Sequence, residues 1–407
     1  MHPVIDSEQL LEDLETLAQF GVDPTGGLSR IAYNPADQDA RAWVIEQMQS
    51  LGMTTKTDKA GNTIALYPGT MPDLPPIALG SHTDTVPNGG RYDGALGVLA
   101  ALACVRALRE NGVQLRHPVE IINFAAEEAT MSSGTFGSRA MTGALNIKEL
   151  EKAAWDGRPV ADHLREAGLD PASFTQAQRA NGAIAAYLEL HIEQGGILEK
   201  EQLSIGVVEG IVGIRRYDVI FEGYANHAGT TPMAGRKDAL VMAAPFISAV
   251  PDVAKAYEIV ATIGTLKVYP GAPNVIPGRV NLSLEIRGLH NTVLDKAEAE
   301  LAKLAKRLGG QIQHINTKEP TQSDSRLLEA LITACDELQL TCKRMPSGAG
   351  HDAMCMASIA PQAMIFVPSQ GGVSHSPDEY TTPEDCVNGA RVLLGALLRL
   401  DEVLNTE

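Results

Sequence analysis

The sequence lacks the features that mark secreted, disulfide-stabilised or membrane-embedded proteins. Its five cysteines are scattered and contain no CxxC pair, which argues against a disulfide framework and against a zinc knuckle. No apolar run reaches transmembrane length, and the N-terminal segment has neither the basic start nor the apolar stretch of a signal peptide. We therefore expect a cytoplasmic protein with reduced cysteines that stays out of the membrane.

The chain also has fewer basic than acidic residues. The chain has 33 Lys and Arg against 50 Asp and Glu, a net charge of −17 at pH 7. Because such a balance repels phosphate backbones and anionic lipid, we expect neither nucleic acid nor a membrane surface as a partner. The remaining composition, 44% hydrophobic and 20% charged, is that of a globular protein, and 407 residues predict two domains.

The first half of the chain has the pattern of an α/β domain whose helices cover a largely parallel sheet, because short apolar strands alternate with helical stretches. Strands are predicted at residues 76–80, 119–126 and 187–190, and each is followed by histidine or glutamate. Open α/β sheets place their sites beyond the carboxyl ends of the strands. The three strand ends are therefore predicted to converge on one crevice.

From residue 215 the pattern changes to that of a compact α+β module with one open sheet face. The predicted elements are a strand at 216–222, a helix at 237–250, paired strands at 259–268 and 279–286, and a helix at 292–308. After residue 321 the α/β pattern resumes. Residues 215–322 are therefore predicted to be an inserted domain, and residues 1–214 and 323–407 a single discontinuous α/β domain.

The strand ends carry residues suited to binding metal. His82 follows the first strand, and Asp93 stands at the head of the next helix. Imidazole and carboxylate are ligands of borderline divalent ions, and one carboxylate can bridge two ions. Asp84 is expected to bond the far nitrogen of His82. By itself this short motif fits a structural role equally well.

The adjacent glutamates Glu127 and Glu128 favour the metal hypothesis. Side chains that are neighbours at a strand end can diverge, so that one carboxylate binds metal while the other holds a proton. Two buried like charges are costly unless a cation offsets them, and a solvated acidic loop fits poorly after an apolar strand. His191 and His375 complete a set of five ligands for two divalent ions, for which Zn, Mn, Co and Ni are all acceptable.

The chain carries eight ordered motifs, which are GSHTDTV (80–86), NGGRYDG (88–94), AEE (126–128), ELHIEQG (189–195), NHAGTTPM (226–233), PNVIP (273–277), SGAGHDA (347–353) and GVSHS (372–376). They resemble the motifs of the hydantoinase/carbamoylase amidases in the M20 metallopeptidase superfamily. This group includes N-carbamoyl-L-amino acid hydrolases, β-ureidopropionases and allantoate amidohydrolases, and the resemblance spans essentially the whole chain.

The resemblance implies a role for each residue of the metal centre and for each of the two domains. The implied metal ligands, with Asp93 bridging the two ions, are His82, Asp93, Glu128, His191 and His375. Glu127 is implied as the general base. The discontinuous domain would hold the metals, and the inserted domain would be a lid that dimerises and contributes a residue to the partner subunit's site.

The resemblance also implies a set of substrate-binding residues. His227 would polarise the scissile carbonyl of the partner's substrate, and Asn274 and Arg287 would bind the substrate carboxylate, for which a bidentate guanidinium is suited. Arg287 is expected to end a strand next to the Asn274 loop. Gln194 and the segment 348–350, which ends at Gly350, would face substrate from the metal-binding domain.

Two features leave alternatives open. His351 and Asp352 are interpreted as a supporting hydrogen-bond pair in preference to further metal ligands. After Glu128, residues 129–134 replace the Ser/Thr-Arg-Phe segment common in the family, which leaves substrate identity open.

The expected reaction is hydrolysis of N-carbamoyl-L-amino acids to amino acid, ammonia and carbon dioxide. Allantoate or another ureido acid such as β-ureidopropionate is the alternative substrate. A dipeptidase of the same superfamily and a non-catalytic metal-binding or scaffold protein are further hypotheses.

Overall fold

The structure is a computed structural model that describes residues 3–404. The first two residues of the N-terminal segment considered above, and residues 405–407, lie outside this description. The chain divides into two compact units. We call Met1–Glu209 with Ser323–Glu407 the discontinuous unit, and Gly210–Gln322 the inserted unit. The insertion begins at residue 210, five residues before the predicted start at 215.

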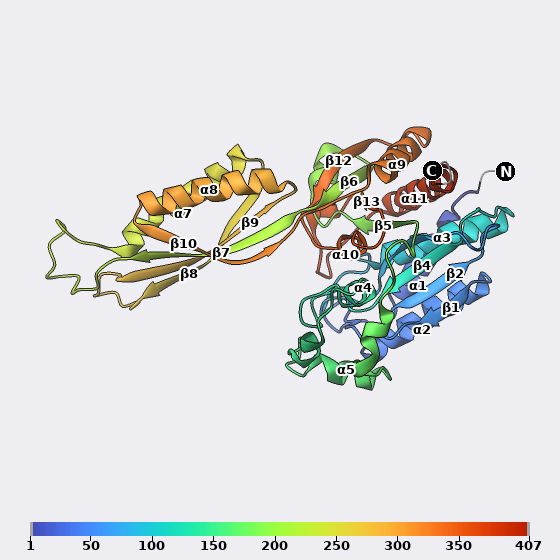
Figure 1. Ribbon diagram of the computed structural model, residues 1–407, viewed down its shortest axis with the longest axis horizontal. Coiled ribbons are helices and arrows are strands. Elements are labelled where there is room, and N and C mark those ends of the chain that lie inside the picture. The colour runs from blue at the N-terminus through green and yellow to red at the C-terminus, as the bar shows by residue number, and fades with distance from the viewer. Residues whose placement is uncertain (1–2, 405–407) are drawn as a thin grey trace. The chain divides into compact units, whose positions relative to one another are not determined.

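The discontinuous unit is built on a nine-stranded sheet with the order β1-β2-β4-β3-β5-β13-β6-β11, in which β12 also pairs with β6 (Figure 1). Its centre is parallel, since β3 pairs in parallel with both β4 and β5, and β13 with β5. The strands of this sheet are β1 (Thr54–Thr57), β2 (Thr63–Tyr67), β3 (Ile77–His82), β4 (Val119–Phe124), β5 (Ala186–Ile192), β6 (Ile205–Ile211), β11 (Thr321–Gln322), β12 (Cys342–Ser347) and β13 (Gln362–Val367). The end of β6 and all of β11 fall by residue number within the inserted unit, where the chain enters and leaves it. The predicted α/β class is confirmed. The sheet is mixed and not largely parallel as expected, because the outer pairs β1–β2, β2–β4, β13–β6 and β6–β11 are antiparallel.

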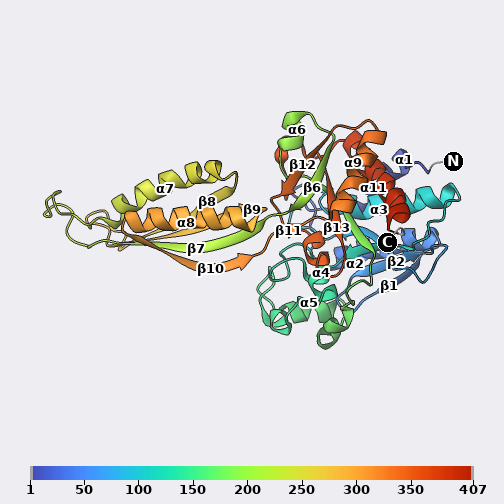
Figure 2. The same cartoon turned by 45° about the horizontal axis from the view of Figure 1, so that its top comes forward.

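Two apolar helices, α3 and α11, form the centre of the core in this unit. Helix α3 is buried from Ala95 to Leu108, and its small Ala and Gly residues let it pack against β3, β5, α1 and α11 (Figure 2). The helices are α1 (Ser7–Leu17), α2 (Pro35–Ser50), α3 (Ala95–Glu110), α4 (Phe136–Met141), α5 (Val160–Glu166), α6 (Ile197–Glu201), α9 (Ser325–Glu337), α10 (Asp352–Met356) and α11 (Pro383–Val403). Short 3-10 turns are η1 (Ile147–Glu151), η2 (Pro171–Ala177) and η3 (Gln370–Gly372). This packing fixes the N-terminus of α3 beside the ends of β3 and β5.

The inserted unit is an antiparallel four-stranded sheet with the order β10-β7-β9-β8, covered on one face by α7 and α8. Its elements are β7 (Gly213–Glu222), α7 (Ala239–Ala256), β8 (Val260–Tyr269), β9 (Arg279–Gly288), α8 (Asn291–Arg307) and β10 (Gly310–Lys318). Strand β9 alternates between buried and less buried residues, as a strand covered on one face must. The predicted pairing of β8 with β9 is confirmed.

Helix α7 corrects the expectation that no apolar run reaches transmembrane length. Among the described residues it is the one helix long and apolar enough to cross a membrane by length and composition, and a third of it is buried. Its buried residues Ala243, Phe246 and Val250 belong to the core of the inserted unit. A core helix that covers a sheet has this same composition.

Candidate metal centre

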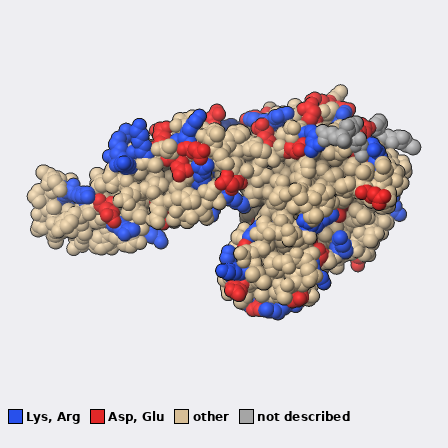
Figure 3. All heavy atoms as spheres, in the orientation of Figure 1, with Lys and Arg blue, Asp and Glu red and all other residues tan. Residues whose placement is uncertain are grey.

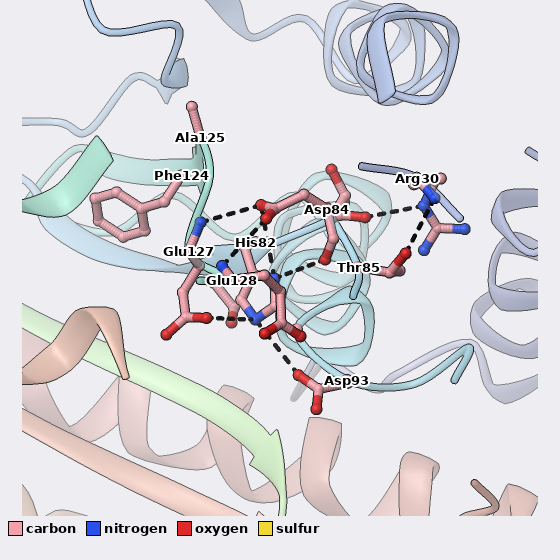
Figure 4. A network of polar contacts seen from close by, with 12 residues as sticks. Arg30, His82, Asp84, Thr85, Asp93, Phe124, Ala125, Glu127 and Glu128 are labelled. Atoms are coloured by element: carbon pink, nitrogen blue, oxygen red, sulfur yellow. Dashed lines mark hydrogen bonds and ion pairs between the residues drawn. The ribbon is translucent and has the colours of Figure 1, made fainter. Parts of the chain in front are cut away.

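The ends of three neighbouring strands bring the predicted metal-binding residues together, and Figure 4 shows His82, Asp93 and Glu128 among them. His82 is the last residue of β3, and His191 precedes the last residue of β5. Glu128 lies four residues beyond β4, and Asp93 lies two residues before α3. His375 follows η3 in a loop. Because β4, β3 and β5 are adjacent and parallel, their carboxyl ends meet at one edge of the sheet.

Asp93 is shared by two groups of three candidate ligands. In one group, Asp93 Oδ1 lies 3.5 Å from His82 Nε2 and 3.2 Å from His191 Nε2. In the other, His375 Nε2 lies 3.4 Å from Asp93 Oδ2 and 3.4 Å from Glu128 Oε1. Ligands about 2.1 Å from a tetrahedral ion stand about 3.4 Å from one another. The donor spacing therefore fits one divalent ion in each group, with Asp93 between them.

Both buried imidazoles are oriented by backbone carbonyls. His82 Nδ1 lies 3.0 Å from the carbonyl oxygen of Asp84, and His191 Nδ1 lies 2.9 Å from that of Ile192. Because a carbonyl only accepts, Nδ1 carries a proton in each ring, and Nε2 is the nitrogen that faces Asp93. Nε2 is therefore the atom through which each histidine could bind a metal.

The structure corrects the role expected for the Asp84 side chain. Its carboxylate oxygen is 3.8 Å from His82 Nδ1, too far for a hydrogen bond, and the backbone carbonyl takes that place. The carboxylate instead accepts the backbone N–H groups of Glu127 and Glu128, each at 3.2 Å. Asp84 therefore positions the glutamate pair, with the guanidinium of Arg41 3.9 Å away.

Glu127 lies beside the candidate ligands and belongs to neither group of them. Its carboxylate lies 3.7 Å from His82 Nε2 (Figure 4). Burial raises the pKa of Glu127 well above its usual value, and the nearby Asp352 and Glu128 add to the rise against the opposing effect of His82. A carboxyl whose pKa is raised in this way holds a proton more readily than an ordinary glutamate does.

Three residues near the centre have backbone conformations that side chains rarely adopt. Ala126, Gln194 and His375 have φ angles of 53°, 57° and 55°. Non-glycine residues in this region carry strain that the surrounding structure must support, and such residues gather at functional sites. Ala126 immediately precedes Glu127, and Gln194 and His375 lie in the two loops that contact Asp93.

The charges of the metal-free centre favour a bound cation. Burial raises the pKa of Glu128 to about 7, and the neighbouring Asp93 adds to the rise. The hydrogen bond to Asp93 raises the pKa of His375 to about 9, in spite of its partial burial. At pH 7 these groups hold protons that a metal ligand cannot keep, so a divalent ion would replace protons on the same donors.

Metal binding is therefore expected to release protons and to strengthen with pH. Below about pH 9 a proton on His375 competes with the metal, so apparent affinity should rise from pH 6 to pH 9, by up to about tenfold per pH unit for each proton displaced. Calorimetric titration of metal-free protein in buffers of different ionisation enthalpy measures the proton count. Binding that is independent of pH and releases no protons would contradict this assignment of ligands.

Gln194 lies against the metal residues. Its amide nitrogen donates to Asp93 Oδ2 at 2.6 Å, and its backbone N–H donates to Ser369 Oγ at 3.1 Å. The amide oxygen is buried and, among the described residues, has no hydrogen-bond partner. The side chain therefore has an acceptor available for a ligand, while its donor holds the carboxylate that both metal groups share.

The segment leading to Gly350 is organised by Ser347. The Ser347 hydroxyl lies 2.9 Å from the carbonyl oxygen of Ala349 and 3.1 Å from His351 Nε2, and Gly350 is exposed. His351 and Asp352 belong to neither group of candidate ligands. Of the supporting hydrogen bonds expected from this pair, His351 makes one to Ser347, whereas both Asp352 carboxylate oxygens are buried without a hydrogen-bond partner in the described chain. The His351 ring also packs on His191, with ring centroids 4.5 Å apart.

The loop after the glutamate pair is folded into its own network. Ser133 Oγ donates to Glu149, Arg139 pairs with the same carboxylate, and Met131 and Phe136 are buried in an apolar cluster. Arg139 therefore does not take the place of the arginine that is missing from residues 129–134, because it is bound to Glu149.

His227 and Asn274 lie side by side in the inserted unit. Their segments form a β-bridge between His227 and Val275, and the N–H of Ala228 donates to the carbonyl of Asn274 at 2.9 Å. His227 Nδ1 accepts the backbone N–H groups of Gly229 and Thr230, so the ring proton is on Nε2. An exposed Nε2–H is the donor that polarising a carbonyl requires.

The expectation that Arg287 lies next to the Asn274 loop is wrong. The loop precedes Arg279, the first residue of β9, whereas Arg287 is eight residues further along this ten-residue strand. At about 3.4 Å per residue in an antiparallel strand, the two ends stand about 27 Å apart. Arg287 pairs with Ile214, at the end of the sheet where the chain enters the unit.

Ser374 and Glu379 contact the shared carboxylate or its backbone and were not predicted from the sequence. The Ser374 hydroxyl lies 2.9 Å from Asp93 Oδ2, and a Glu379 oxygen accepts the backbone N–H of Asp93 at 3.1 Å. The one signal for Ser374 is its place beside His375, and Glu379 lies four residues beyond that histidine.

Comparison with known proteins agrees with this geometry. The model of peptidase family M20/M25/M40 matches residues 78–399. The chain is 40% identical to an N-carbamoyl-L-amino acid amidohydrolase of Geobacillus stearothermophilus, with 98% of this chain and 99% of that protein aligned. It is 37% identical to an allantoate amidohydrolase of Bacillus subtilis, with 95% and 96% aligned. A hydantoinase/carbamoylase family amidase from Burkholderia phymatum superposes with a TM-score of 0.89 at 35% identity over 100% of both chains.

The chain therefore belongs to peptidase family M20/M25/M40. Within that family it falls among the hydantoinase/carbamoylase amidases, so the predicted resemblance is confirmed. It is a hydrolase of C–N bonds that acts on small molecules, of a metal-dependent family, and its His, Asp and Glu groups are arranged to hold metal.

Proposed function

We propose that the chain is a di-metal amidohydrolase that removes the carbamoyl group from N-carbamoyl-L-amino acids, giving amino acid, ammonia and carbon dioxide. The observation that carries the proposal is the sharing of Asp93 between two groups of candidate ligands, with Glu127 3.7 Å from His82. The relative from Geobacillus stearothermophilus bears the name of this activity. The relative named allantoate amidohydrolase makes allantoate the second candidate substrate, with other ureido acids such as β-ureidopropionate.

His82, Asp93 and His191 would hold one divalent ion, and Asp93, Glu128 and His375 the other. When bound, such ions lower the pKa of a water and polarise the scissile carbonyl; Zn, Mn, Co and Ni all suit these donors.

The protein's own groups then handle protons and orientation. Glu127 accepts the proton of the attacking water and returns it to the departing nitrogen, for which its raised pKa is suited. His227 Nε2–H donates to the carbonyl oxygen as negative charge develops on it. Asp84 holds the backbone of the glutamate pair in place during both transfers.

We further propose a homodimer in the cytoplasm in which the inserted units complete the sites. His227 and Asn274 lie at one end of the inserted sheet and Arg287 at the other, about 27 Å away. A single inserted unit cannot place both ends of its sheet against one small substrate. Arg287 is therefore assigned to the substrate carboxylate in its own subunit's site, and His227 and Asn274 to the partner's site.

The charge of the chain gives no support to a nucleic-acid partner. The net charge is −17, and acidic and basic side chains are interspersed on the face shown in Figure 3. A small ureido or carbamoyl acid remains the proposed partner.

An ammonia-release panel on metal-reconstituted protein tests the function. The substrates are N-carbamoyl-L-amino acids, their D-enantiomers, allantoate, β-ureidopropionate and dipeptides, the last followed by amine release. The highest kcat/KM is expected for an N-carbamoyl-L-amino acid. A higher value for allantoate would transfer the assignment to the second candidate, and activity on none of the compounds would overturn the proposal.

A further inference from the structure

Glu379 is a buried carboxylate outside both groups of candidate ligands, yet it is bonded to the backbone of Asp93. It is 4% exposed. One oxygen accepts two successive backbone N–H groups, from Tyr92 at 2.9 Å and from Asp93 at 3.1 Å. Only Gly94 separates these N–H groups from the start of α3, so Glu379 determines where the chain lies as it presents Asp93.

The second oxygen of Glu379 reaches the Asp93 side chain through Ser374. The Ser374 hydroxyl lies 2.9 Å from this oxygen and 2.9 Å from Asp93 Oδ2. Asp93 Oδ2 is the oxygen that faces His375 and Glu128, whereas Oδ1 faces the other two histidines. Glu379 is thus connected to both the backbone and the carboxylate of the residue that the two groups share.

The loop that contains Asp93 is shaped around the Glu379 carboxylate. A Cβ atom on Gly90 would stand 2.0 Å from a Glu379 oxygen, which no real contact allows. Gly90 does not have a left-handed backbone, so its lack of a side chain serves the close approach of the carboxylate and not the conformation of the loop. An alanine at position 90 would displace Glu379 without imposing backbone strain.

We propose that Glu379 is a positioning residue of the metal centre, which holds Asp93 so that its two oxygens face the two groups of ligands at once. The inference rests on the proposed di-metal function and adds to it a residue that touches neither metal nor substrate. Partners of this kind orient ligands, and their loss typically lowers metal affinity or activity about 10- to 100-fold.

The test is titration of metal-free protein with Zn²⁺ against a competing chelator, which yields a dissociation constant and a count of ions without reference to activity. For Glu379→Ala we expect the dissociation constant of the weaker ion to rise about 10- to 100-fold. Glu379→Gln should stay near the wild-type value, since its amide oxygen still accepts both N–H groups and its amide nitrogen can donate to Ser374. Gly90→Ala should behave like Glu379→Ala.

Asp401 supplies the matched control. Its buried carboxylate also accepts two successive backbone N–H groups, from Arg116 at 2.9 Å and His117 at 2.8 Å, at a place with no candidate ligands. Asp401→Ala removes this carboxylate as Glu379→Ala removes the other, and it should leave the Zn²⁺ dissociation constants unchanged. Should Glu379→Ala fail to fold, Gly90→Ala and Ser374→Ala decide the matter by the same titration.

Unchanged Zn²⁺ binding in Glu379→Ala, or in both substitute variants, would overturn the positioning role. Equal weakening in Asp401→Ala would overturn it too, because the effect would then be one of general stability. Failure of the proposed function is distinguishable, since in that case the wild-type protein itself would bind no pair of ions.

Discussion

Glutamine at position 127 is expected to lower kcat by about 10²- to 10⁴-fold, the contribution typical of a positioned general base. The amide keeps the size of the side chain and cannot take the proton of the attacking water. Glu127 belongs to neither group of candidate ligands, so the variant should still bind two ions per subunit. Steady-state ammonia release together with metal analysis of the purified protein measures both quantities.

Glu128→Gln is the matched control, because it makes the same chemical change on the adjacent residue. Glu128 Oε1 lies 3.4 Å from His375 Nε2 within the second group of ligands, so this variant should lose one ion. Metal loss in Glu127→Gln and retention in Glu128→Gln would mean that the two glutamates have the opposite roles.

His227→Ala is expected to lower kcat by about 10²- to 10³-fold, equivalent to about 2.7–4 kcal/mol of transition-state stabilisation from one donor to a developing oxyanion. The measurement is kcat at saturating substrate. His314→Ala removes another exposed histidine of the inserted unit, on β10, and should leave kcat unchanged. A His227→Ala variant with near-normal turnover would refute the assigned role.

Combining the His227→Ala and Glu127→Gln variants tests whether His227 acts in the site of the partner subunit. A mixed dimer has one site with an intact Glu127 that faces an intact His227 on the other subunit. Co-expression should therefore restore about a quarter of wild-type activity if subunits pair at random. No recovery from dimers shown to be mixed would mean that His227 serves its own subunit.

The positions of the strand-end residues could be predicted because two local rules agree. Apolar runs mark β3, β4 and β5, and parallel strands that are neighbours end at one edge of the sheet. His82, Glu128 and His191 follow from that rule without any knowledge of side-chain angles. The alternation along β9 and the apolar spacing of α8 gave the inserted unit in the same way.

Contacts that depend on loop geometry could not be predicted. A short motif brings Asp84 near His82, but only the turn decides whether its carbonyl or its carboxylate bonds Nδ1. The alternation of apolar and polar residues located Arg287 at a strand. Which end of that strand lies at the Asn274 loop depends on the length and direction of β9. Glu379 reaches Asp93 across 286 positions of the chain, and no local pattern encodes that contact.

The most direct measurement of the central claim is anomalous diffraction from crystals of the protein grown with Zn²⁺ or Mn²⁺, at the absorption edge of that metal. We expect two peaks per subunit, both within bonding distance of Asp93, one also bound by His82 and His191 and the other by Glu128 and His375. A single peak, or peaks away from Asp93, would contradict it.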